Sequence, residues 1–296
     1  MNRHVVYRQI NKDYAYWIEK RRVGQTKGGQ TAGLLSYVEE GIVRQNILFD
    51  CGLGTLEGLA DCCDDSFWDE PLAVFITHGH ADHHLELMIL AEIYCERRGE
   101  NVLDRRPPLP VYCTDQTQQH LYNTHRWGYT GGGTLQHRHI LSGSTIFLNP
   151  FTLLPLAVDH FPGAVIYTIT FGADPQHKII VGWDTTTLPL SEAEINNLAH
   201  PSLALFEGTT WTKTAIPTGH SCITEMVETG FLDRLDLAFD PTAQRYGAYL
   251  VHYSGLEDPD GMMSDEALQA KIDHTYPHLA PVLHVAERGQ TWRFDI

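Results

Sequence analysis

The heptapeptide Thr77-His78-Gly79-His80-Ala81-Asp82-His83 determines how the rest of this chain is interpreted. It places three imidazoles and one carboxylate within six residues, between an apolar run at residues 72–76 and a helical pattern at residues 85–95. This order predicts a strand, then a loop that carries ligands, then a helix. Imidazole nitrogen and carboxylate oxygen together suit Zn²⁺, Mn²⁺ or Fe, so the loop is a candidate metal site.

The spacing within this loop indicates two sets of ligands. His78 and His80 point to the same side of an extended turn, because side chains alternate along an extended chain, and they can bind one ion. Asp82 and His83 lie beyond the bend and can face a second ion. The alternative is a polar loop with chance histidines, since the chain contains 17 of them. The tight spacing directly after a predicted strand favours the metal site.

The composition is that of a globular protein. With 296 residues, of which 43% are hydrophobic and 20% charged, the chain can bury a core as one large domain or two small ones. No apolar run is long enough to cross a bilayer, and Met1-Asn2-Arg3-His4 lacks the apolar core of a signal peptide. We therefore expect a cytoplasmic protein without a membrane partner. The six cysteines form no CxxC pair and are expected to be free thiols.

The charge of the chain limits the substrate that it can bind. A formal net charge of −16 and a pI near 5.4 disfavour nucleic acid as a partner, because nucleic-acid-binding proteins usually present a basic surface. A small anionic substrate is still compatible with this charge, since bound metal ions supply positive charge locally.

The spacing His78-x-His80-x-Asp82-His83 resembles the signature of the metallo-β-lactamase superfamily. Other short motifs occur in the order that this family shows, each at the end of an apolar run: Asp50-Cys51-Gly52-x-Gly54-Thr55, His160, Gly182-x-Asp184-Thr185, Glu207-Gly208-Thr209, Gly219-His220-Ser221, and His252 after residues 248–251. Several of these turns are similar to those of the branch that includes ribonuclease Z and the cyclic phosphodiesterases of phosphonate pathways.

The resemblance implies an α/β fold, an αββα sandwich in which two mixed β-sheets pack face to face with helices on the outer faces. A single domain over residues 1–296 is expected, with an insert at about residues 97–140. Within the insert, the glycine- and aromatic-rich residues 128–139 are either a lid over the site or a plain surface loop. His137 and His139 are expected to be surface or core histidines rather than ligands.

The resemblance also implies two divalent metal ions, with Zn²⁺ favoured and Mn²⁺ or Fe as alternatives. The implied ligands fall into a first site, a second site and a bridging residue: His78, His80 and His160; Asp82, His83 and His252; and Asp184. For Asp50 two roles stay open. It can orient a ligating histidine from behind, or it can form an Asx-turn with its own backbone.

The chemistry implied by the family is hydrolysis. Two cations lower the pKa of a shared water, and the resulting bridging hydroxide attacks the substrate. By resemblance, His220 is the general acid that protonates the leaving alkoxide and Glu207 orients it, while Asp82 counts among the catalytic residues as well as the ligands. A charged imidazole at a helix start is unfavourable, which argues against a purely structural His220. The implied activity is that of a phosphodiesterase acting on a small phosphodiester, open or cyclic.

Two features depart from the ribonuclease Z pattern. The segment between His160 and Asp184 is too short for a basic, glycine-rich arm that binds transfer RNA, and Leu85-Glu86-Leu87 stands where Gly-Leu is usual. A transfer-RNA 3′-end endonuclease is therefore a less favoured alternative. A lactonase or β-lactamase-type hydrolase on the same metals stays open, as does a binding protein that has kept the fold. A homodimer is also expected, because many relatives pair.

Other patterns predict the elements around these motifs. A helix is expected at residues 115–127, with Thr114 as its N-cap, and a second at residues 223–229, with Ser221 as its N-cap. A strand is expected at residues 235–239. Residues 1–30 are mixed and yield no clear element.

Overall fold

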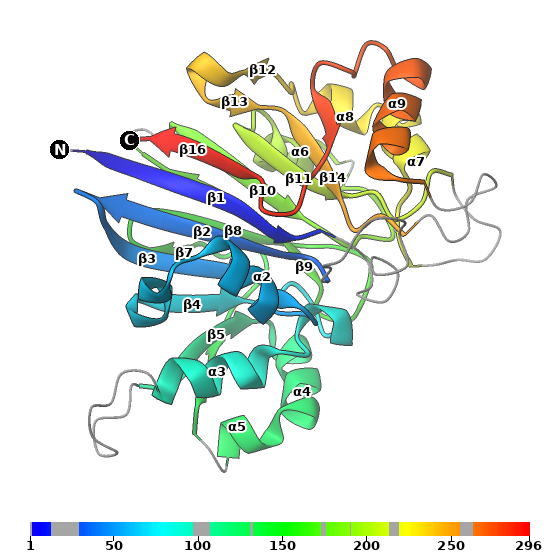
Figure 1. Cartoon of the computed structure of the whole chain (residues 1–296). Coiled ribbons are helices and arrows are strands. Elements are labelled where there is room, and N and C mark those ends of the chain that lie inside the picture. The colour runs from blue at the N-terminus through cyan, green and yellow to red at the C-terminus, as the bar shows by residue number, and fades with distance from the viewer. Residues whose placement is uncertain are drawn as a thin grey trace.

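Two β-sheets form the centre of the molecule (Figure 1). The structure, a computed structural model, describes residues 2–12, 30–96, 107–130, 133–172, 176–189, 191–212, 219–254 and 263–296. Within these ranges the first sheet consists of seven strands: β1 (Arg3–Asn11), β2 (Ala32–Glu39), β3 (Ile42–Phe49), β4 (Leu72–Phe75), β5 (Leu109–Cys113), β6 (Leu135–His139) and β16 (Thr291–Asp295). Its strand order is β16-β1-β2-β3-β4-β5-β6.

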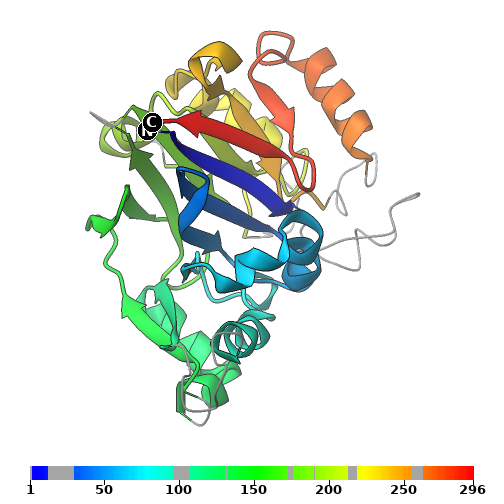
Figure 2. The same ribbon diagram turned by 60° about the vertical axis from the view of Figure 1, so that its left-hand side comes forward.

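The second sheet also has seven strands within the described ranges: β7 (Ile146–Leu148), β8 (Phe151–Ala157), β9 (Val165–Phe171), β10 (His177–Gly182), β11 (Leu203–Glu207), β14 (Ala248–Val251) and β15 (Leu283–Val285). Their order is β15-β14-β11-β10-β9-β8-β7, and a small hairpin of β12 (Phe239–Asp240) and β13 (Arg245–Tyr246) is separate from both sheets. Parallel and antiparallel pairs occur in each sheet. Because β1 pairs with β16, the first and last strands lie side by side (Figure 2).

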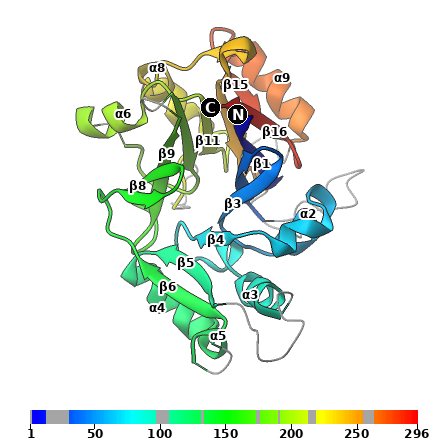
Figure 3. The same ribbon diagram turned by 90° about the vertical axis from the view of Figure 1, so that its left-hand side faces the viewer.

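Helices cover the outer face of each sheet (Figure 3). Over the first sheet lie α2 (Thr55–Cys62) and α3 (Leu87–Glu96), and beside α3 lie α4 (Asp115–Thr124) and α5 (Arg126–Thr130). Over the second sheet lie α6 (Glu192–Leu198), α7 (Ile223–Glu228), α8 (Phe231–Arg234) and α9 (Asp265–Thr275). Three short 3₁₀ helices complete the described elements: η1 (Asp65–Asp69), η2 (Ala81–His83) and η3 (Pro241–Ala243). The predicted αββα sandwich is confirmed.

Alternation along continuous apolar strands produces these layers. In β4, Ala73 and Phe75 belong to the core between the sheets, whereas Leu72 and Val74 pack under the outer helices. Successive side chains of a strand point to opposite faces of the sheet. The sequence of a strand that is buried on both faces is therefore a continuous apolar run. The two sheets therefore share one core and each has a second core beneath its helices.

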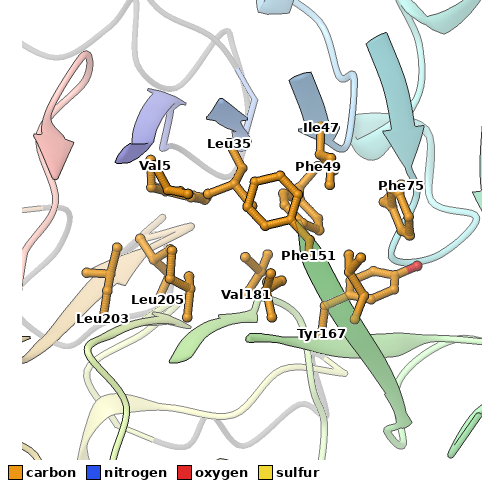
Figure 4. Close-up of a cluster of buried hydrophobic side chains, with 14 of the residues drawn as sticks. Val5, Leu35, Ile47, Phe49, Phe75, Phe151, Tyr167, Val181, Leu203 and Leu205 are labelled. Atoms are coloured by element: carbon orange, nitrogen blue, oxygen red, sulfur yellow. The ribbon is translucent and has the colours of Figure 1, made fainter. Parts of the chain in front are cut away.

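The core between the sheets is built from large side chains that meet face to face. Figure 4 shows Leu35 and Phe49 of the first sheet opposite Val181 and Tyr167 of the second. The rings of Phe49 and Tyr167 lie 5.6 Å apart at a tilt of 51°. The Tyr167 hydroxyl donates to the backbone oxygen of Ile76 at 3.1 Å, which joins the second sheet to the first just before the metal-loop candidate.

Among the described residues, none of the helices combines the length and the apolar character that a bilayer crossing requires.

One predicted strand is wrong. Leu235 is the C-cap of helix α8, and its side chain is fully buried in the core between the second sheet and its outer helices. Asp236 then adopts a φ of 51°, which turns the chain, and only Phe239–Asp240 is extended. The apolar residues of this segment reflect the packing of a short helix and not the pairing of a strand.

Other local predictions are corrected at the ends of elements. The N-cap of α7 is Cys222 and not Ser221, because the Ser221 hydroxyl and amide both donate to Glu207. Thr114 caps α4 as expected. Residues 135–139 form strand β6 and not a loop, whereas residues 97–106 and 131–132 of the expected insert lie outside the described residues. Strand β1 was not predicted from the sequence, since its inner half buries polar side chains.

At Gly52, the turn after β3 passes close to the backbone of the metal-loop candidate. A Cβ at Gly52 would lie 1.8 Å from the backbone oxygen of Asp82. The neighbouring Cys51 amide donates to the His83 oxygen at 2.7 Å, so the two turns are held together at this point.

We predict that Gly52→Ala lowers the free energy of unfolding by roughly 2–3 kcal/mol, because the methyl group forces these backbones apart. Urea unfolding monitored by fluorescence measures the change. The control is Gly41→Asn, where a Cβ meets nothing within 4 Å; Asn tolerates the left-handed φ of 79° better than most residues, so we expect only the backbone cost of about 1 kcal/mol or less. Equal stabilities of the two variants would contradict the prediction.

Candidate metal centre

The first group of imidazoles converges at the ends of strands from both sheets. Nδ1 of His80 lies 3.0 Å from Nε2 of His78 and 3.1 Å from Nε2 of His160. His78 and His80 follow β4, whereas His160 follows β8 on the facing sheet. Burial lowers the pKa of all three side chains, that of His80 to about 4, with neighbouring imidazole charges adding to the effect. They are therefore neutral near pH 7, and the neutral imidazole is the form that binds metal.

The second group lies next to the first. Oδ2 of Asp82 lies 3.6 Å from Nε2 of His83 and 3.5 Å from Nε2 of His252. Asp82 and His83 belong to the 3₁₀ helix η2, and His252 follows β14. One tight turn and the end of one strand thus deliver these three side chains to one place.

Asp184 lies between the two groups. Its Oδ2 is 2.9 Å from Nε2 of His83, 3.4 Å from Nε2 of His78 and 3.6 Å from Nε2 of His160. Donor atoms of His78, His80, His160 and Asp184 lie within 4.8 Å of one another, and those of Asp82, His83, Asp184 and His252 do so as well. The structure therefore brings all seven predicted ligands together, with Asp184 common to both groups.

The electrostatics of this cluster fit divalent cations. In the described part of the chain, the buried carboxylate of Asp184 has imidazole nitrogens as its close polar neighbours, of which Nε2 of His83 at 2.9 Å is one, and neither oxygen has a well-aligned hydrogen bond. A buried carboxylate without well-aligned donors is costly. Burial alone would lower the pKa of His83, but the carboxylates of Asp184, Asp50 and Asp82 outweigh it and raise that pKa well above its usual value. Positive charge is favoured here, and a metal ion can supply it in place of a proton.

Asp50 holds two of the histidines from behind. Its Oδ2 lies 2.6 Å from Nδ1 of His83 and accepts a hydrogen bond from the Thr77 hydroxyl at 2.7 Å. The Thr77 oxygen in turn lies 3.0 Å from Nδ1 of His78 and accepts from it. Each imidazole is thereby fixed with Nε2 toward the cluster. Burial raises the pKa of Asp50, while its bonds from His83 and Thr77 lower it in part.

Of the two roles open for Asp50, this geometry matches orientation of a ligating histidine. Asp50 has a φ of 59°, a left-handed conformation that is uncommon for a residue with a side chain. Such strain is found where the surrounding structure requires one exact side-chain direction. The Asx-turn alternative is not seen, because both carboxylate oxygens bond to residues 77 and 83.

His160 and His252 are positioned by backbone and hydroxyl groups. Nδ1 of His160 donates to the Gly219 oxygen at 2.5 Å. Nδ1 of His252 lies 3.1 Å from the Thr209 hydroxyl oxygen, and its amide donates to the Lys12 oxygen at 2.5 Å. His252 also has a left-handed backbone, with φ at 63°.

Glu207 and His220 form a second buried pair beside the cluster. Oε2 of Glu207 lies 2.8 Å from Nδ1 of His220, and the His220 ring lies 4.8 Å from that of His160 and 5.3 Å from that of His252. Oε1 of Glu207 accepts from the Thr185 amide at 2.5 Å and from the Ser221 amide and hydroxyl at 3.2 and 3.1 Å. Glu207 is thus rigidly held with one oxygen facing His220.

This environment favours the protonated form of His220. Burial alone would lower its pKa, but the hydrogen bond to Glu207 and the charge of Asp184 outweigh it and raise the pKa to about 9. Glu207 accepts the hydrogen of His220 Nδ1, so the other ring nitrogen, Nε2, can donate.

His137 and His139 join none of the ligand groups. Nε2 of His137 contacts the Cys113 oxygen, and Nδ1 of His139 contacts Asp115.

Comparison with known proteins places the chain in a family. The model of the β-lactamase superfamily domain matches residues 45–236, which is more than half of the chain. The chain belongs to the metallo-β-lactamase superfamily. This family carries divalent metal ions, and the histidine and aspartate groups described above could bind them. Among curated proteins, no sequence matches this chain.

Solved structures share the metallo-β-lactamase fold over nearly the whole chain. A diphosphatase from the PhnP family has a TM-score of 0.66 at 15% identity, covering 99% of this chain and 98% of that one. Unliganded yeast PDE1 has a TM-score of 0.62 at 13% identity, covering 99% and 100%. The short form of human tRNase Z has a TM-score of 0.59 at 16% identity, covering 97% and 98%. At these identities the likeness concerns the fold.

Sequence reasoning missed the residues that orient the ligands. Thr77 stands directly before the first histidine, and Thr209 stands two residues after Glu207. The sequence does not indicate which imidazole either hydroxyl contacts. Ser221 was interpreted as a helix cap. Only the fold shows that all three hydroxyls serve buried carboxylates.

We predict that Asp184→Asn reduces the metal content from about two ions per chain to about one or fewer, because an amide cannot neutralise two adjacent cations. Metal analysis by mass spectrometry after dialysis measures the content. Asp236→Asn is the control, since Asp236 is exposed and pairs with His200, and it should keep the wild-type content. Retention of two ions by Asp184→Asn would refute the bridging role.

Proposed function

We propose that this chain is a binuclear metal-dependent hydrolase that acts as a phosphodiesterase on a small, open or cyclic phosphodiester. The observation that carries the proposal is the buried Glu207–His220 pair, which fixes an imidazole with a carboxylate on its Nδ1 at the edge of the ligand cluster. Cleavage of a P–O ester bond releases an alkoxide, which is a poor leaving group without a proton. Hydrolysis of a β-lactam or lactone on the same cluster has less need of this donor.

Two groups of ligands would hold the metal ions. His78, His80 and His160 would bind one ion, and Asp82, His83 and His252 the other, with Asp184 between them. Zn²⁺ fits the nitrogen-rich donor set best, and Mn²⁺ or Fe is compatible with it. When bound, the ions supply Lewis acidity and lower the pKa of a coordinated water.

The residues of the chain carry the proton transfer. Glu207 accepts the Nδ1–H of His220 and holds the ring so that the Nε2–H can point toward the leaving oxygen. As the P–O bond breaks, the oxygen takes the Nε2 proton and His220 becomes neutral. Glu207 stabilises the charged imidazole before this step, and water restores its proton afterwards.

The size of the proposed substrate follows from charge and topology. Net charge is −16, which disfavours a long polyanion. After His160, β9 and β10 form a direct antiparallel pair, and the described residues of this segment include no arm for transfer RNA. A diphosphatase of the PhnP family and yeast PDE1 share the fold, which supports chemistry at phosphorus. We also propose a cytoplasmic location and a homodimer, for which size measurement in solution is the test.

We predict that His220→Ala slows hydrolysis of alkyl phosphodiesters by roughly 10²–10⁴-fold and that of p-nitrophenyl phosphodiesters far less. The reason is that p-nitrophenolate leaves without a proton. Rates for methyl and p-nitrophenyl esters of the same phosphate, measured with Zn²⁺ or Mn²⁺, give the comparison.

The control for this series is His200→Ala, since the His200 side chain is exposed and pairs with Asp236, away from the ligand cluster. It should match the wild type on both esters. Equal losses of His220→Ala on both esters would remove His220 as general acid. Turnover of lactones or β-lactams with no phosphodiester turnover in the wild type would replace the proposal by the lactonase alternative.

A further inference from the structure

Two buried histidines beside the cluster have no part in the proposed chemistry. Nε2 of His84 lies 3.2 Å from the backbone oxygen of Gly79, and Nδ1 of His84 lies 3.0 Å from Nε2 of His125. Because a carbonyl oxygen only accepts, His84 must donate at Nε2, and a neutral His84 then accepts at Nδ1. His125 therefore donates its Nε2–H. This leaves one arrangement of protons, a chain from His125 through His84 to Gly79.

Both side chains are suited to such a chain. His84 and His125 are almost fully buried. The His84–His125 contact of 3.0 Å joins two ring nitrogens, and such a contact needs a hydrogen on only one of them. Gly79 stands between His78 and His80, and His125 follows directly on helix α4. The hydrogen-bond chain thus joins α4 to the loop that carries two of the three imidazoles of the first site.

The other end of α4 contacts the loop that carries the third imidazole. The Thr114 hydroxyl, which caps the helix, donates to the Gly163 oxygen at 2.9 Å. The buried Thr117 hydroxyl lies 3.4 Å from the same oxygen. A Cβ at Gly163 would lie 2.3 Å from the Thr114 hydroxyl, so this loop passes directly against the helix three residues after His160.

Between these two ends, α4 packs against both loops at once. The ring of Phe161 lies 4.6 Å from that of His120 and 4.4 Å from that of His80. A Cβ at Gly79 would lie 2.9 Å from the Cβ of His120 and 3.0 Å from Phe161. The helix, the Gly79 backbone and the Phe161 ring therefore form one close-packed contact without room for movement.

We propose that helix α4 is the positioning element of the first metal site, acting through the His125–His84–Gly79 hydrogen-bond chain at one end and the Thr114–Gly163 bond at the other. The site needs such an element because its ligands come from two loops on different sheets. Metal affinity depends on ligand positions to within about 0.5 Å. In the described residues, the second site meets α4 only through His84, which follows His83, whereas both loops of the first site contact the helix. This inference rests on the metal centre of the proposed function.

The experiment is competition for Zn²⁺ between a chromogenic chelator and the whole protein, which resolves two dissociation constants. His125→Leu removes the donor to His84 and keeps an apolar side chain. We expect one Zn²⁺ dissociation constant to rise by roughly 10–100-fold, the size of effect known for groups behind metal ligands. His160→Ala and His252→Ala identify the constants of the first and second sites, and the constant of the first site should rise more than that of the second in His125→Leu.

Matched variants separate positioning from general damage. His125→Gln keeps an N–H donor and should retain most of the affinity, whereas Thr114→Val should weaken the first site from its other loop. Asn123→Ala, exposed on α4, should match the wild type. The melting temperature of the metal-free variants reports on folding, and we expect His125→Leu and His125→Gln to melt alike.

The outcomes distinguish two kinds of failure. Unchanged Zn²⁺ constants in His125→Leu, or equal weakening at both sites, would overturn the role of α4 and leave the proposed function in place. Absence of Zn²⁺ binding by the wild type would overturn the metal centre and the inference with it. Selective weakening of the first site, with recovery in His125→Gln, would establish the role.

Discussion

Hydrogen bonds behind the imidazoles are the interaction on which the site depends. An imidazole can offer one nitrogen to a cation only when its other nitrogen is held, because the ring otherwise rotates and changes tautomer. Asp50 does this directly for His83 and through the Thr77 hydroxyl for His78. One buried carboxylate at the end of β3 therefore fixes two rings of different ligand groups, and its left-handed backbone is the conformational cost of aiming it.

Glu207 repeats this arrangement on the second sheet. It holds His220 directly and His252 through the Thr209 hydroxyl. Each sheet thus contributes a carboxylate at a strand end, a threonine and two imidazoles. The two arrangements differ in one ring. His220 is not among the proposed ligands and lies at the edge of the cluster, where it can donate a proton to a leaving group. The same local design can therefore serve ligand orientation on one side and acid catalysis on the other.

The parts of this structure that could be predicted are those encoded locally. His78, His80 and His83 stand within a few residues after an apolar run. His160, Asp184 and His252 likewise follow apolar runs that predict strands. The role of Ser221 could not be predicted, because a serine before a helix fits a cap equally well. His84 and His125 are 41 residues apart, and nothing in either local pattern indicates that they meet. Strand β1 escaped prediction because Gln9 and Asn11 are buried in it.

The pairing of β1 with β16 has a consequence for biosynthesis. The backbone amide of His252 bonds to the Lys12 oxygen at the end of β1, and β1 needs β16 as its outer neighbour. During translation, a nascent chain that has exposed the heptapeptide still lacks three of the seven ligands, His160, Asp184 and His252, and strand β16 at one border of its first sheet. Metal binding at the complete site therefore follows synthesis of β14 and His252, and a shorter nascent chain has only a partial, low-affinity set of ligands with which to retain an ion.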